Sequence, residues 1–201
     1  LKDALNTVSN LSLGDAGGVQ TLRMRGLSSN KYKLLLNGIE LKDPVSTDGI
    51  PFLEGVNLSN IDRIEVISGT QGSLYGSDAI AGVIQIFTKN KTGENFIKTS
   101  VGNNFNKTEL GLYSELYGTN LVLNASKLFE NQKSWVTGTT EKDHSDLNTL
   151  SLNISKKLGK TTLSAFGLVS ELNQDLDGYN SNFQMDDTSD TVKKQQNLFK
   201  F

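Results

Sequence analysis

The pattern of apolar and polar positions divides the chain near residue 90. Before that point, short segments of different kinds follow one another; after it, apolar and polar residues alternate with a period of two in one segment after another. A period of two indicates β-strands with one apolar and one polar face. We therefore expect a small α+β domain over residues 1–90 and a series of antiparallel strands over residues 91–201.

The first part contains signals for a helix, a hairpin and separate strands. Leu1, Leu5, Val8 and Leu11 are spaced for one face of a short helix. Asn-Gly at 37–38 separates two apolar runs within 31–41, which is a strong hairpin signal. The Pro, Asp and Gly content of 42–51 predicts a loop. Strands are expected at 21–26, 61–68 and 82–89.

The second part predicts six strands, at 96–102, 108–116, 120–129, 147–158, 161–172 and 192–201. Their connections alternate between tight turns and long loops, the latter at 130–146 and 173–191. This alternation is typical of an outer-membrane β-barrel, although a soluble antiparallel sandwich would give the same strands. Because membrane barrels need about eight strands or more, a barrel that begins here is cut before it closes.

Composition excludes several classes of protein. The net charge of −2 gives no reason to expect nucleic-acid binding. The absence of cysteine excludes disulfides and thiolate metal sites. No apolar run approaches the ~18 residues of a membrane-spanning helix, and no signal peptide is present, so we expect a mature or truncated piece.

The stretch "GSLYGSDAIAGVIQIFT" (72–88) is dense in glycine and runs directly into a strand. A phosphate-binding loop would need Lys and a hydroxyl after its second glycine, whereas Gly76 is followed by Ser77 and Asp78. Close approach of backbone segments and positive φ angles are the better explanation for Gly69, Gly72, Gly76 and Gly82. The chain also lacks any nucleophile–base or acid–base constellation, so we do not expect an enzyme.

Four segments in the first part carry a family resemblance: "DALNTVSNLSL", "LRMRG", "KLLLNGIEL" and "IDRIEVISGTQGSLYGSDAIAGVIQIFTK". In this order and spacing, they resemble the plug domain of TonB-dependent outer-membrane receptors, over about residues 1–90. The cobalamin (vitamin B12) receptor branch is the most similar, and ferric-siderophore receptors share most of the motifs. The resemblance implies an α+β plug followed by the first strands of a truncated transmembrane β-barrel. It departs from the family at Thr70–Ser73, where a proline is usual.

The resemblance also implies a function in the bacterial outer membrane. The expected role is active uptake of a bulky, scarce nutrient, with cobalamin as the expected substrate, powered through TonB, whose contact segment would precede residue 1. A ferric-siderophore receptor is the alternative within the class, and a soluble adhesin or carbohydrate-binding sandwich is the alternative outside it. By the same resemblance, the loops that contact substrate contain Val19, Thr21, Ser28, Val45 and Ser46.

Charged residues of the plug are expected to form a polar network with the barrel wall. In the family, plug arginines meet acidic residues of the lumen, and a buried charge needs such a partner. The candidates are Arg25, Glu40, Arg63 and Glu65, with a solvated strand face as the alternative for each.

The segment 173–190 is rich in aspartate, and clustered carboxylates favour a hard cation such as Ca²⁺. Cobalamin receptors order comparable loops with calcium, whereas a solvated acidic loop is the alternative; no cofactor is otherwise required. His144 is expected to be exposed in a polar loop, and Trp135, Tyr113, Tyr117 and Phe129 suit an aromatic girdle at the membrane surface. The candidate calcium ligands are Asp175, Asp177, Asp186, Asp187 and Asp190.

Overall fold

A computed structural model of the chain describes residues 5, 8, 10–16, 19–42, 56, 60–90, 93–133, 142–179 and 185–201. The chain divides into two compact units, Leu1–Lys89 and Asn90–Phe201. The boundary expected from the sequence lies one residue away from this division.

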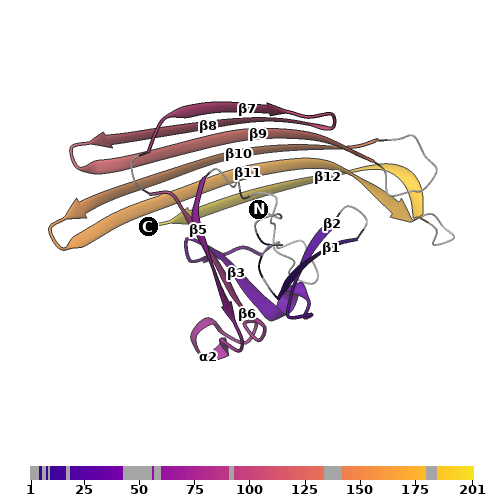
Figure 1. Cartoon of the computed structure of the whole chain (residues 1–201), viewed down its shortest axis with the longest axis horizontal. Coiled ribbons are helices and arrows are strands. Elements are labelled where there is room, and N and C mark those ends of the chain that lie inside the picture. Colours follow the sequence, from indigo (N-terminus) through magenta and orange to yellow (C-terminus); the bar gives the residue numbers. More distant parts are fainter. Residues whose placement is uncertain are drawn as a thin grey trace. The chain divides into compact units, whose positions relative to one another are not determined.

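Unit 1 contains a two-stranded hairpin and a four-stranded mixed sheet (Figure 1). The hairpin joins β1 (Leu11–Ala16) to β2 (Val19–Met24). The sheet has the order β4-β3-β6-β5, in which β3 (Tyr32–Leu36) and β6 (Gly82–Thr88) pair in parallel at the centre. The remaining strands, β4 (Ile39–Glu40) and β5 (Ile61–Ser68), pair antiparallel at the edges. Two short helical turns, η1 (Ser29–Lys31) and α2 (Gly72–Tyr75), precede β3 and β6.

The central strands are apolar on both faces because both faces are covered. Leu34 and Leu36 of β3 are buried, as are Val83, Ile84 and Ile86 of β6. Continuous apolar runs of this kind are typical of strands inside a mixed or parallel sheet. The hydrophobic core of unit 1 therefore lies around β3 and β6.

The expected hairpin at 37–38 is confirmed. Asn37 and Gly38 have φ angles of 49° and 83°, which is the two-residue turn that matches the twist of paired strands. Asn37 also joins this turn to β6: its Nδ2 donates to Thr88 Oγ1 at 2.7 Å, and its Oδ1 accepts from the Thr88 amide at 3.0 Å. One asparagine thus shapes the turn and fixes it to a strand 51 residues away.

The glycine stretch has a specific steric explanation at its end. A Cβ atom on Gly82 would lie 2.2 Å from the Ile67 carbonyl oxygen, and the φ angle of Gly82 is +147°. Gly76 closes α2 with a φ angle of 91°. Gly69 and Gly76 have open space around them and fit the prediction only through their positive φ angles, whereas Gly72 has neither a close neighbour nor a positive φ angle, so the prediction is wrong for Gly72.

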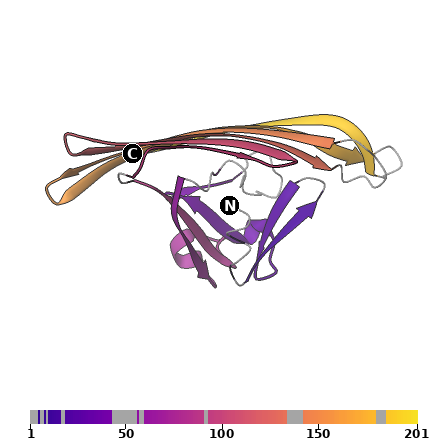
Figure 2. The same cartoon turned by 45° about the horizontal axis from the view of Figure 1, so that its top comes forward.

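Unit 2 is a six-stranded antiparallel sheet in the order β12-β11-β10-β9-β8-β7 (Figure 1). Figure 2 shows this sheet nearly edge-on, as one curved layer. The strands are β7 (Phe96–Val101), β8 (Phe105–Leu116), β9 (Thr119–Lys133), β10 (Lys142–Leu158), β11 (Thr161–Tyr179) and β12 (Met185–Lys200).

The tight turns at one end of unit 2 occur where the sequence predicted them. Tyr117 and Gly118 connect β8 to β9, and Gly159 and Lys160 connect β10 to β11. The expected long loops are largely wrong, because β9 to β12 extend far into 130–146 and 173–191. Polar residues continue the ladder there, since main-chain pairing does not require apolar side chains.

The expected N-terminal helix is only partly visible. Leu5 is helical and fully buried, but Leu11 begins β1, so the helix does not extend to the last residue of its apolar pattern. Most of the predicted loop at 42–51 lies outside the described residues. Among the described residues, no helix is both long enough and apolar enough to cross a membrane.

Candidate functional site

The two faces of the unit 2 sheet have an arrangement opposite to that of a water-soluble protein. On β10, Leu150 and Leu152 are 49% and 38% exposed, whereas Ser151 and Asn153, which alternate with them, are 4% and 8% exposed. On β11, Val169 is exposed and Ser170 is completely buried, but Phe166, Leu168 and Leu172 are also buried on the face of Ser170. An exposed apolar face is the arrangement of a strand that faces lipid. In a soluble sandwich, this is the face that a second sheet would cover.

The exposed apolar residues form a band. Leu110, Ala125, Leu150 and Val169 lie in one row across β8 to β11. Two residues further along each strand, towards the longer connections, the row in register is polar: Thr108, Lys127, Asn148 and Glu171. The band therefore ends at the same row on these four strands.

A polar group of side chains lies above the band, towards the ends of the longer connections. The Asp175 carboxylate accepts hydrogen bonds from the His144 amide at 3.1 Å and from Thr191 Oγ1 at 3.2 Å. His144 Nδ1 lies 3.2 Å from the same carboxylate, and the His144 ring lies 6.0 Å from the Phe129 ring. His144 is exposed as expected, but it belongs to β10, so its assignment to a loop is wrong.

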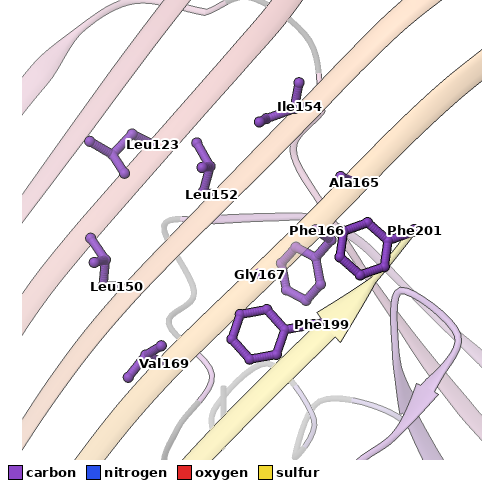
Figure 3. A pocket seen from close by; sticks show the side chains of 10 residues that line it. All are labelled: Leu123, Leu150, Leu152, Ile154, Ala165, Phe166, Gly167, Val169, Phe199 and Phe201. Carbon is purple, nitrogen blue, oxygen red and sulfur yellow. The ribbon is translucent and has the colours of Figure 1, made fainter.

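An apolar groove of about 330 Å³ lies within the band (Figure 3). The small residues Ala165 and Gly167 form its floor on β11, while Leu150 and Leu152 of β10 lie on one side and Phe199 of β12 on the other. Apart from the buried Phe166, the residues that line the groove lie on the exposed apolar face of unit 2.

The polar face of unit 2 carries a row of hydrophilic residues across all six strands. Ser126 Oγ lies 2.6 Å from Thr149 Oγ1, and Glu109 forms an ion pair of 2.7 Å with Lys107. The Oγ atom of the buried Ser170 has no hydrogen-bond partner among the described residues. A hydrophilic face of this kind suits the inside of a plugged barrel. In register, the row is Lys98, Glu109, Ser126, Thr149, Ser170 and Gln196.

In unit 1, the charges of the predicted polar network form separate groups. Arg63 donates to Glu65 Oε1 at 2.7 Å and lies 3.3 Å from Asp62 Oδ2. Its guanidinium carbon also lies 3.9 Å from the centroid of the Phe87 ring. The hydrogen bond to Glu65 is the main cause of the raised pKa of Arg63. This group stabilises the strand pair β5–β6 from its solvent-exposed side.

Arg25 and Glu40 lie in two further groups. Arg25 occupies an exposed two-residue turn with a φ angle of 54°, and its amide donates to the Asn10 carbonyl at 2.7 Å. Glu40 accepts from Lys33 Nζ at 2.9 Å. The structure therefore pairs Arg63 with Glu65 but does not bring the four residues into one network; their contact with a barrel wall stays a prediction.

The candidate substrate residues are only partly described. Ser28 is exposed just before η1, and its Oγ donates to Asn30 Oδ1 at 2.9 Å. Thr21 is half-buried on β2. Val19 is placed at the start of β2, but its side chain lies outside the described residues, as do Val45 and Ser46 entirely.

The candidate calcium ligands are distributed over two strands. Asp175 and Asp177 belong to β11, and Asp186, Asp187 and Asp190 belong to β12, so the assignment of this segment to a loop is wrong. Of these five side chains, only that of Asp175 is described. Among the described residues, no three His, Asp or Glu side chains come together as metal ligands.

Sequence reasoning missed a chain of charges at the start of β3. Lys42 Nζ lies 3.4 Å from Asp78 Oδ2 and 3.9 Å from Glu40 Oε1, while Lys33 binds the other oxygen of Glu40. The hydrogen bond from Lys42 is the main cause of the lowered pKa of Asp78. Lys42 and Asp78 are 36 residues apart, so no local pattern could have indicated the pair.

Comparison with known proteins identifies unit 1. The family described as TonB-dependent Receptor Plug Domain matches residues 1–83. Unit 1 is a TonB-dependent receptor plug domain. This confirms the resemblance drawn from the sequence motifs.

Curated relatives extend the match to about residue 90. The chain is 37% identical over 91 residues to a vitamin B12 transporter BtuB of Vibrio vulnificus, covering 44% of this chain and 14% of the relative. It is equally identical, over 92 residues, to an iron-regulated outer membrane virulence protein of Vibrio cholerae, covering 43% and 14%. The chain thus spans only about a seventh of the length of these relatives. They confirm the expected location in the bacterial outer membrane.

Solved structures share the fold of both units. The pyoverdine receptor FpvA of Pseudomonas aeruginosa gives a TM-score of 0.73 at 14% identity, covering 99% of this chain and 28% of FpvA. The ferric enterobactin receptor PfeA of the same species gives 0.66 at 16% identity, covering 87% and 30%. At such identities, the likeness concerns the fold alone. It shows that the two units resemble a plug and barrel strands.

Proposed function

We propose that the chain is the plug domain and the first barrel strands of a TonB-dependent receptor that takes up cobalamin across the outer membrane. The observation that carries the proposal is the 37% identity to a vitamin B12 transporter across the plug. The exposed apolar face of unit 2 supports the membrane-barrel part of the proposal. The receptor would bind its nutrient on the outside and use TonB to open the plug, without covalent chemistry.

Substrate contact is proposed for Val19, Thr21, Ser28, Val45 and Ser46. Ser28 supports this proposal because it is exposed and carries a hydroxyl group that can bind an amide. Tyr32, which would suit a ferric catecholate, is 3% exposed, and burial raises the pKa of its hydroxyl. The side chain of Tyr32 is therefore part of the core rather than of the substrate surface.

A ferric-siderophore receptor is the second candidate. It is favoured by the iron-regulated relative, which is as similar to the plug as the vitamin B12 transporter. The complete receptor should be titrated with cyanocobalamin and with ferric enterobactin. Saturable binding of cyanocobalamin, and uptake that disappears in cells without TonB, would support the proposal; binding of ferric enterobactin alone would establish the second candidate.

Calcium remains part of the proposal for the aspartate-rich segment 173–190. The Asp175 carboxylate already binds His144 and Thr191, so a cation there would compete with these contacts. Calorimetry of the complete receptor tests this directly, and the absence of a heat of calcium binding would refute it.

A further inference from the structure

The charge chain at the start of β3 places Lys42 between two carboxylates. Its ammonium group lies 3.4 Å from Asp78 and 3.9 Å from Glu40. The Lys42 and Asp78 side chains are 50% and 44% exposed, so an incoming ligand can reach both. Lys33 neutralises much of the charge of Glu40 from the opposite side, at 2.9 Å.

This charge chain lies at the same end of the sheet as Ser28. Tyr32 at the start of β3 pairs with Gly82 at the start of β6, and the Ala81 amide donates to the Lys31 carbonyl at 2.7 Å. Lys42 is placed beside Lys33 because the preceding Leu41 amide donates to the Leu34 carbonyl at 2.8 Å. Lys42 also directly precedes the segment with the proposed substrate residues Val45 and Ser46.

The electrostatic consequence depends on the charge of the ligand. An uncovered lysine attracts any anion, whereas a lysine held by carboxylates presents a local field close to zero. An anionic ligand that approaches Lys42 must also approach Asp78, which repels it. A ligand without net negative charge meets no such penalty and can still accept a hydrogen bond from the ammonium group. Binding specificity of this kind comes from the repulsion between the Asp78 carboxylate and an anionic ligand.

We propose that Asp78 and Glu40 contribute to substrate selectivity by covering the charge of Lys42, so that the position of Lys42 accepts an uncharged, amide-rich ligand and disfavours anionic ferric complexes. This inference rests on the proposed function, because it assumes that the Ser28 end of the plug faces the substrate. The lowered pKa of Asp78 is consistent with it, because the carboxylate then stays ionised in mild acid.

The matched variants are Asp78→Asn and Asp62→Asn. Both remove an exposed carboxylate that pairs with a cation in the plug, but Asp62 pairs with Arg63, at 3.3 Å, rather than with Lys42. In the complete receptor at low salt, Asp78→Asn should lower the Kd for ferric enterobactin about three- to tenfold. The Kd for cyanocobalamin should change less than about twofold, and Asp62→Asn should change neither. Equal effects of the two variants on ferric enterobactin would overturn the inference.

A second measurement needs no substrate. Lys42 should react more slowly with an anionic acetylating reagent (a sulfonated succinimidyl ester) than with its uncharged analogue, relative to the exposed Lys157. Asp78→Asn should reduce this difference at Lys42 only, as read by mass spectrometry. If Asp78→Asn leaves the ratio of the two acetylation rates at Lys42 unchanged, Asp78 does not cover the charge of Lys42. If the ratio changes as expected but the wild-type receptor binds no cyanocobalamin, the proposed substrate is wrong while the electrostatic inference stands.

Discussion

Replacement of Gly82 by alanine tests whether the plug depends on one close backbone contact. The added Cβ would lie 2.2 Å from the Ile67 carbonyl oxygen and 2.5 Å from Met24 Cε. The Met24 side chain can move, but the carbonyl group belongs to the paired strand β5 and cannot move without disturbing the sheet. Alanine is also strained at a φ angle of +147°.

The expected loss of stability can be estimated from these two effects. Backbone strain of this kind costs about 1–3 kcal/mol. Overpacking against a fixed neighbour costs about 1–3 kcal/mol more. Together they should destabilise the plug by about 2–6 kcal/mol, which is a large part of the stability of a small domain.

Hydrogen exchange of the β6 amides in the complete receptor is the assay. A loss of about 3 kcal/mol should accelerate their exchange roughly hundredfold where opening of the plug limits it. Gly72→Ala is the matched control, because nothing lies within 4 Å of its added Cβ. The reasoning is refuted if exchange in the two variants is equally slow.

Three further outcomes are expected. Asn37→Ala removes both side-chain bonds to Thr88 and strains a φ angle of 49°, so β6 should lose about 2–3 kcal/mol in the same exchange assay; wild-type rates would contradict this. Leu152→Arg should cost the complete receptor about 2–4 kcal/mol in vesicle-based urea unfolding if the exposed face meets hydrocarbon, and no loss would exclude a lipid-facing position. Because Lys42 lowers the pKa of Asp78, the pair stabilises the plug fully above the unfolded pKa of Asp78 and stops doing so as the pH falls through the lower folded value. The difference in unfolding midpoint between wild type and Asp78→Asn should therefore shrink only in acid, and a pH-independent difference would contradict this.

The predicted strand ends in unit 2 were wrong for one common reason. Predicted strand ends in unit 2 followed the end of the apolar alternation, but β10 begins at Lys142 and β11 continues to Tyr179. Beyond the apolar band, the side chains become polar while the main-chain ladder continues. The apolar alternation therefore indicates only the part of each strand that lies within the exposed apolar band, and the strands themselves are longer.

The grouping of charges could not be predicted for a related reason. Arg63 and Glu65 share one face of β5 and meet, as their spacing by two suggests. Arg25 was expected in the same network because of its residue type, but a turn places it at an exposed tip. Ion pairs between distant segments depend on strand order and register, which local sequence does not encode.

The sequence by itself determined the family of the plug, the order of strands and turns in both units, and the Asn37–Gly38 hairpin. These properties arise from local periodicity, from turn chemistry and from motifs that are contiguous in the chain. Only the tertiary structure decided which face of the unit 2 sheet is exposed, why Gly82 admits no side chain, and that Asp78 covers Lys42. Each of these depends on the distance between atoms of different strands, and the parallel pairing of β3 with β6 sets such distances across some fifty residues of chain.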